Sequence, residues 1–145
     1  MHIKDNDCLF TEGKVTLPDG YQDRTVNVMT SAQQGAAAIN ISRDSLNENE
    51  SLAAYIDRQL ALLAQHLKGW KQGTREPVEL GDNYLVGECV HASYLRDGKR
   101  VWQQQAVFNT QENHILVFTI TKTAALDAAD IQLFGQLLAS FAGHD

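Results

Sequence analysis

Features typical of a secreted domain or a membrane protein are scarce in these 145 residues. The chain has only two cysteines, Cys8 and Cys89. They could form one disulfide, but two reduced thiols are the expected state, because small secreted domains usually carry several bridges. No segment approaches the roughly 20 apolar residues that span a bilayer. The first residues have no apolar run behind a basic residue, so we expect no signal peptide and a cytoplasmic protein.

Clustered basic residues and known cofactor motifs are also missing. The 12 basic side chains are scattered among 18 acidic ones, and the formal net charge is -6. This balance argues against a nucleic-acid partner, which would require clustered lysines and arginines to neutralise phosphates. No spacing of cysteines and histidines fits a metal site, and no glycine-rich phosphate loop occurs. We therefore expect neither a metal nor another cofactor.

One pair of residues keeps an enzymatic alternative open. Cys89 and His91 lie two positions apart in an expected strand, so their side chains share a face. A nucleophilic thiol needs a base within reach, and this histidine could provide it. A small buried thiol beside a hydrogen-bonded histidine explains the same pattern more simply. The sequence therefore favours a protein that is not an enzyme.

Hydrophobic periodicity predicts two amphipathic helices. Apolar residues recur three or four positions apart over residues 52–67, behind a candidate N-cap at Ser51 or Asn49. A second helix is expected to begin after the N-cap candidate Asp127 and to end near Gly143. Each helix has one apolar stripe, which should pack against a sheet.

The rest of the chain is predicted to form strands. Asp97-Gly98 suits the tight turn of a hairpin, and a strand that starts at Trp70 is expected to stop before Pro77. The expected strands are residues 8–10, 14–17, two within 24–44, 70–76 with a short continuation at 78–80, 84–95, 100–109 and 114–122. This order predicts a single α+β domain over residues 1–145. Its largely antiparallel sheet would carry both helices on one face and leave the other as a concave binding surface.

Alternation along three strands selects the candidate binding residues. Two strands carry narrow aliphatic stripes, and a third places two glutamines on the same face as valines. Amides in an apolar strand are half exposed, bond to the neighbouring backbone, or serve a ligand that is mainly apolar. An apolar face without helices needs a cover, which dimerisation, peptide binding or both would provide. The six candidates are Val26, Val28, Ile39, Ile41, Gln103 and Gln105.

An ordered set of short motifs resembles the Eag chaperones of bacterial type VI secretion. The set consists of Val26-Asn27-Val28, then Ile39-Asn40-Ile41-Ser42-Arg43-Asp44, then Tyr55-Ile56-Asp57-Arg58-Gln59-Leu60. The Arg-Asp-Gly-Lys turn and the Gln-Gln-Ala-Val-Phe strand extend the resemblance over nearly the whole chain. These chaperones belong to the DcrB-like group, so the resemblance implies a PsbP-like α+β fold.

The resemblance also implies a function. Eag chaperones bind hydrophobic transmembrane segments near the N-terminus of PAAR-containing effectors, often Rhs-type toxins, before the effectors are loaded on the secretion spike. They act as homodimers whose concave sheet faces grip these helices, without inserting into the membrane themselves. By position, the six candidates would line that face, with aliphatic side chains replacing lipid and glutamines replacing hydrogen bonds between helices. A small-molecule or lipid-binding module of the same fold is the alternative.

Overall fold

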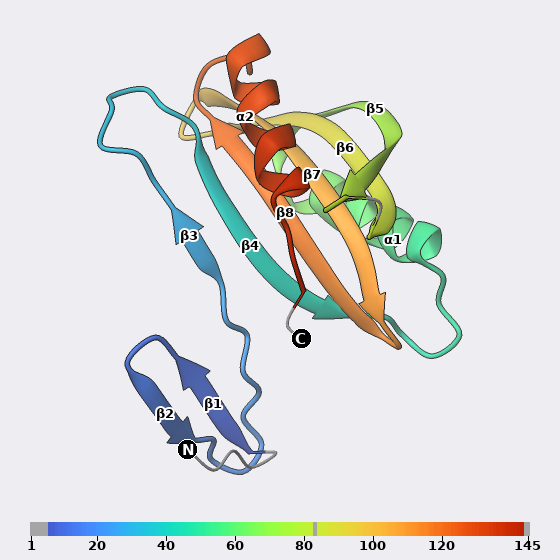
Figure 1. The fold of residues 1–145 in the computed structure, drawn as a ribbon. Helices are drawn as coiled ribbons and strands as arrows, with labels where there is room; N and C mark the ends of the chain where they lie inside the picture. Colours follow the sequence, from blue (N-terminus) through green and yellow to red (C-terminus); the bar gives the residue numbers. More distant parts are fainter. Residues whose placement is uncertain (1–5, 83, 144–145) are drawn as a thin grey trace.

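Six strands form one antiparallel sheet and two more form a separate hairpin in the computed structural model (Figure 1). The structure describes residues 6–82 and 84–143. The strands of the large sheet lie in the order β3-β4-β8-β7-β6-β5. In chain order, the elements are β1 (Asp7–Phe10), β2 (Gly13–Thr16), β3 (Asn27–Met29), β4 (Ala38–Ser45), α1 (Leu52–His66), β5 (Lys68–Leu80), β6 (Leu85–Arg96), β7 (Lys99–Gln111), β8 (His114–Lys122) and α2 (Ala128–Ala139).

The predicted α+β class is confirmed, with two helices and an antiparallel sheet. Strands β6, β7 and β8 form the expected meander, and each pairs with the next. The turn between β6 and β7 places Asp97 and Gly98 at φ angles of 52° and 79°, as the Asp-Gly signal indicated. Strand β3 has only three residues, so Val26 lies just before it.

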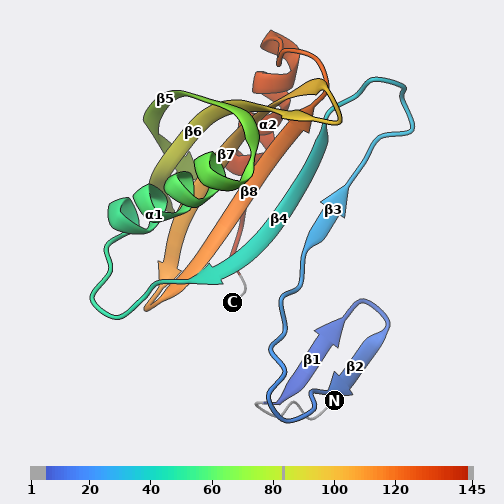
Figure 2. The ribbon, with the colours of Figure 1, turned by 180° about the vertical axis from the view of Figure 1, so that it is seen from behind.

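The two helices pack on opposite faces of the sheet, which corrects the expectation that both share one face. Figures 1 and 2 view the molecule from opposite sides, with α2 in front in one and α1 in front in the other. Helix α1 shares a buried cluster with Val107 and Ile115, whereas α2 shares one with Phe108 and Leu116. Neighbouring residues of a strand point to opposite faces, so these clusters mark the two sides of the sheet.

The central strands explain this arrangement. Val107 and Phe108 of β7 follow one another and are only 4% and 0% exposed, so this part of the strand is covered on both faces. A helical stripe indicates which side of a helix is apolar. It does not indicate which face of a sheet the helix will cover. The sequence therefore predicted the helices correctly and their placement wrongly.

Both helices begin at N-caps that the sequence indicated. Ser51, rather than Asn49, accepts a hydrogen bond from the backbone N–H of Ala54 at 3.1 Å. Asp127 and Asp130 each accept a bond from the other's backbone N–H, at 2.9 and 3.0 Å. These bonds satisfy N–H groups that the first turn of a helix leaves without partners.

Strand β5 continues through Pro77, so the predicted stop before this residue is wrong. Pro77 lies opposite Glu88 in the ladder with β6. Because β5 is at the edge of the sheet, half of its N–H groups face away from β6, and a residue without an N–H is tolerated there. The sequence did not show which strand would lie at an edge.

The β1–β2 hairpin stands apart from the large sheet (Figures 1 and 2). Leu9, Phe10 and Val15 are 44, 49 and 53% exposed. All three lie outside the two hydrophobic clusters formed by the described residues. A two-stranded hairpin is marginally stable alone in water. This hairpin therefore offers apolar surface for contact with something other than its own sheet.

Candidate binding groove

One row of side chains crosses the α1 face of the sheet. Strand pairing places Val28 of β3, Asn40 of β4, Thr119 of β8 and Gln105 of β7 side by side in that order. The neighbouring row consists of Ala38, Thr121 and Gln103. Because directly paired residues share a face, amides and hydroxyls lie at the centre of this surface. An aliphatic side chain, that of Val28, lies at its edge.

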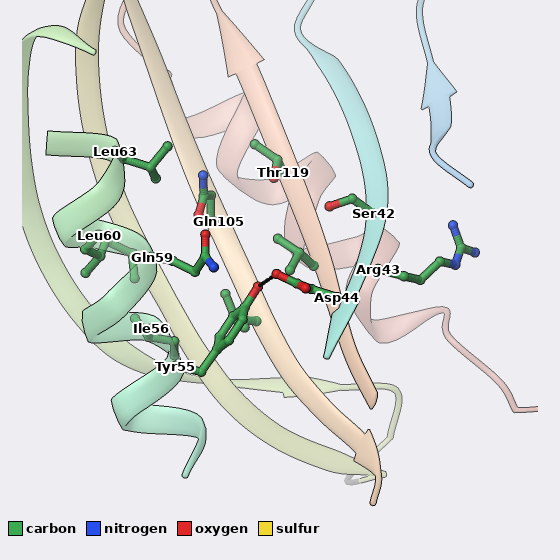
Figure 3. A pocket seen from close by; sticks show the side chains of 13 residues that line it. Ser42, Arg43, Asp44, Tyr55, Ile56, Gln59, Leu60, Leu63, Gln105 and Thr119 are labelled. Carbon is green, nitrogen blue, oxygen red and sulfur yellow. Dashed lines mark hydrogen bonds between the residues drawn. The ribbon is translucent and has the colours of Figure 1, made fainter. Parts of the chain in front are cut away.

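Helix α1 forms one wall of this surface. Figure 3 shows Gln59 of α1 and Gln105 of β7 with their side chains directed into the same cleft, beside Leu63. Both carboxamides present N–H donors and an oxygen acceptor to a ligand in this cleft.

Two hollows join along this face. The cleft beside α1 has a volume of about 200 Å³, and a shallower hollow over β4, β8, β7 and β6 has a volume of about 500 Å³. Gln105 and Thr119 line both. We call the two hollows together the groove. Its floor is polar and half buried, so it suits an elongated ligand that is mainly apolar but presents a few polar groups.

A hydrogen bond joins α1 to β4 at one end of the groove. The hydroxyl of Tyr55 donates to Asp44 Oδ2 at 2.7 Å (Figure 3). Burial, and then this bond, raise the pKa of the Tyr55 phenol. Arg58 holds Glu50 through two bonds of 2.9 and 3.0 Å and lies over the Tyr55 ring at 5.2 Å from its centroid. These four side chains fix the start of α1 against the sheet.

At the opposite edge, Arg43 holds the segment that carries the two candidate valines. Its Nη1 donates to Asn27 Oδ1 at 2.7 Å and to the backbone oxygen of Thr25 at 3.1 Å. Val26 and Val28 are 52% and 66% exposed. The valine side chains are therefore accessible, while the backbone beside them is held to β4.

The structure brings together only part of the predicted site. Gln103 and Gln105 share the α1 face, as alternation predicted, and Val28 lies in the same row as Gln105. Ile39 and Ile41 lie on the other face, in or against the core beneath α2, and Ile39 is 7% exposed. The expectation that all six candidates line one surface is therefore not met.

The six candidates leave out several residues that line the groove, among them Gln59 and Thr119. Gln59 precedes Leu60, so it lies at the margin of the apolar stripe of α1, where it reaches the cleft. Thr119 is 8% exposed and lies directly between Asn40 and Gln105. The signal for Thr119 was present in the alternation of β8. To place Thr119 in the groove from this signal, one must also know that β8 lies between β4 and β7 in the sheet.

Cys89 and His91 lack the geometry of a nucleophile and its base. His91 Nε2 lies 2.9 Å from Glu76 Oε1, and Cys89 Sγ lies 3.8 Å from Gln104 Oε1. Burial, with a smaller contribution from the charge of Glu76, raises the pKa of the Cys89 thiol to about 11. The thiol is therefore protonated at neutral pH, and the thiolate that attacks is the minor form. Both cysteines are free.

In residues 6–82 and 84–143, no helix has both the length and the apolar character needed to cross a bilayer. The same part of the chain contains no group of three or more histidine, cysteine or acidic side chains arranged to hold a metal ion.

Comparisons with known proteins agree with this architecture. The model of the DcrB family matches residues 12–140. The chain is 27% identical to Effector EagT6 of Pseudomonas aeruginosa over 117 residues, which is 79% of either protein. The crystal structure of PA94, a protein of unknown function from Pseudomonas aeruginosa, has the same fold, with a TM-score of 0.73 at 20% identity over 96% of both chains. Since the family model covers most of the sequence, the expected DcrB-like, Eag-type family is confirmed, and this chain belongs to the DcrB family.

Proposed function

We propose that this protein is a type VI secretion effector chaperone that shields transmembrane segments near the N-terminus of a PAAR- or Rhs-type effector until the effector is loaded on the secretion spike. The observation that carries the proposal is the groove, which has an accessible aliphatic edge and a floor of amides and hydroxyls. The similarity to Effector EagT6 supports a role with an effector. The chaperone would act in the cytoplasm, without entering the membrane and without catalysis.

The chemistry of such a client explains the composition of the groove. A membrane-spanning helix exposes about 20 apolar residues and aggregates in water. A protein that replaces the lipid must supply aliphatic contacts, which Val26 and Val28 offer. Polar groups of transmembrane helices normally bond across to a neighbouring helix. The amides of Gln59 and Gln105 could provide the same bonds.

Co-expression with an effector tests the proposal. The N-terminal region of a PAAR- or Rhs-type effector would be produced with this chain, and with the double variant Val26→Asp/Val28→Asp, then captured and analysed by light scattering. Burying one valine stabilises a complex by about 1.5 kcal/mol, so the double variant should bind at least about a hundredfold more weakly. Binding should also require the apolar segments of the effector.

The matched control is Ile131→Asp/Leu133→Asp. These two aliphatic residues are 48% and 51% exposed on α2, on the opposite side of the sheet. Charge there should leave capture unchanged. Equal capture by the Val26→Asp/Val28→Asp variant and the parent would exclude the β3 edge as the contact surface.

We further propose that the chaperone is a homodimer in which the β1–β2 hairpin packs on a second copy. The hairpin exposes Leu9, Phe10 and Val15 and forms a two-stranded sheet separate from the large one. A contact with another copy would bury this apolar surface.

A small-molecule or lipid-binding module is the alternative function. The cleft beside α1, at about 200 Å³, is smaller than the roughly 300–1,000 Å³ of most small-molecule sites, whereas the adjoining hollow of about 500 Å³ lies within this range. Mass spectrometry of solvent extracts from the purified protein distinguishes the two functions. A stoichiometric lipid in protein produced without an effector would favour the alternative.

A further inference from the structure

We propose that Arg43 and Asp44, two consecutive residues of β4, form a brace that holds both walls of the groove and thereby sets which helices it accepts. The inference rests on the proposed function and adds two positioning residues to it. The two side chains bind elements that are far apart in the chain. One is α1, which lines the cleft, and the other is the β3 segment, which lies beside the groove because Val28 pairs with the groove residue Asn40; we call them the α1 wall and the β3 wall.

Arg43 holds the β3 wall. Strand β3 is an edge strand that pairs with β4 at only three positions. Such a short edge strand has few ladder bonds to keep it in place. The guanidinium adds bonds to Asn27 Oδ1 and to the Thr25 backbone oxygen, on either side of Val26. The position of the aliphatic edge therefore depends on Arg43 as well as on the ladder.

Asp44 holds the α1 wall. Its carboxylate accepts the Tyr55 hydroxyl across the end of the cleft at 2.7 Å (Figure 3). A hydrogen bond to an ionised group is stronger than a neutral one. Tyr55 is 4% exposed and belongs to the hydrophobic cluster beneath α1. Since Gln59 lies one turn further along the same helix, this bond also fixes where its amide enters the cleft.

The brace works because β4 itself is fixed. This strand pairs with β8 at eight consecutive positions, from Ala38 to Ser45. Consecutive residues of a strand point to opposite faces, so Arg43 and Asp44 reach in different directions from one rigid point. Two adjacent side chains therefore contribute to the distance between the two walls, beside the β3–β4 ladder and the packing of α1 on the sheet.

The first test measures the distance between the walls without any client. Spin labels on Thr30→Cys and Leu62→Cys, in a Cys8→Ser background, report on the β3 and α1 walls by pulsed electron resonance. Both labelled positions are exposed, and Cys89 is buried. Arg43→Gln and Tyr55→Phe should each broaden or shift the distance distribution. The control Arg100→Gln removes similar bonds, to the Gly69 oxygen and Ser93 Oγ, and should not change it.

The second test measures selectivity. Two apolar segments of about 20 residues, one with alanines and one with leucines along one side, would each be fused to a soluble carrier and co-expressed with the chaperone. The parent protein should bind one of the two segments with a lower dissociation constant than the other. Arg43→Gln and Tyr55→Phe should reduce the ratio of the two dissociation constants about fivefold, the equivalent of one net hydrogen bond. A loss of folding stability alone would weaken both segments by the same factor.

Two results would overturn the brace. One is an unchanged distance distribution in both variants, and the other is an unchanged ratio of dissociation constants. Capture of neither segment by the parent protein would instead contradict the proposed function. The distances would then still decide whether Arg43 and Tyr55 hold the walls.

Discussion

At the scale of single residues, Gly87 shows how closely the central strands approach. A Cβ atom at this position would collide with the carbonyl oxygen of Val107 and lie 2.7 Å from Phe108 Cδ1. The Gly87→Ala variant should therefore lower the free energy of unfolding by about 1–3 kcal/mol, as overpacking does elsewhere. Urea denaturation monitored by circular dichroism measures this change.

Gly135 provides the matched control. It lies in α2, and a Cβ there would meet nothing within 4 Å. The Gly135→Ala variant should raise the free energy of unfolding by about 0.5–1 kcal/mol, because alanine favours the helix. Equal effects of the two substitutions would show that the close approach at Gly87 has no energetic consequence.

Single residues also show how far the sequence could predict the groove. The common face of Gln103 and Gln105 was predicted correctly, because alternation depends only on neighbouring residues. Ile39 and Ile41 were assigned to the same surface because they are aliphatic. Their face depends on where α2 packs, and this follows from long-range contacts that periodicity does not contain.

At the scale of secondary structure, the start of α2 is set by Asp127. Its carboxylate accepts the Asp130 N–H, and α2 carries the buried residues Phe134 and Leu138. The Asp127→Ala variant should lower the free energy of unfolding by about 1 kcal/mol. Asp127→Asn retains a capping oxygen, so it should restore most of this loss in a thermal melt. The same loss in both variants would show that capping is not the source of the effect.

The helices and strands themselves were easier to predict than which of them lie side by side in space. Both helices and the β6–β7–β8 meander occur where periodicity and turn residues indicated. The order of the strands in space was not available from these patterns. This explains why the continuation of β5 through Pro77 was missed. It also explains why the short length of β3 was not predicted: β3 is an edge strand that pairs with β4 alone, and it is shorter than its alternating sequence suggests.

At the scale of the whole molecule, we expect the hairpin to control the oligomeric state. The Leu9→Asp/Phe10→Asp variant should convert the proposed dimer to a monomer, because charge at an apolar contact cannot be buried without cost. Multi-angle light scattering measures the mass. Because dimerisation stabilises the folded chain by mass action, the melting temperature of the parent should rise with protein concentration, whereas that of the variant should not.

The Ile131→Asp/Leu133→Asp variant again serves as the control, since it changes a similar exposed area on α2. It should retain the mass of the parent. A parent protein that is already monomeric at micromolar concentration would contradict the dimer, and the exposed hairpin would then need a different partner.

The alternation of β7 also has an evolutionary consequence. Gln103 and Gln105 face the groove, whereas Ala106 and Phe108 are fully buried on the other face. If the groove binds a client as proposed, a substitution at the first pair would change what the protein recognises, whereas a substitution at the second pair would change whether it folds. Selection can therefore act on the two sets of positions separately. A lineage that acquires a new client can diverge along one side of this strand while its ancestral core is inherited on the other.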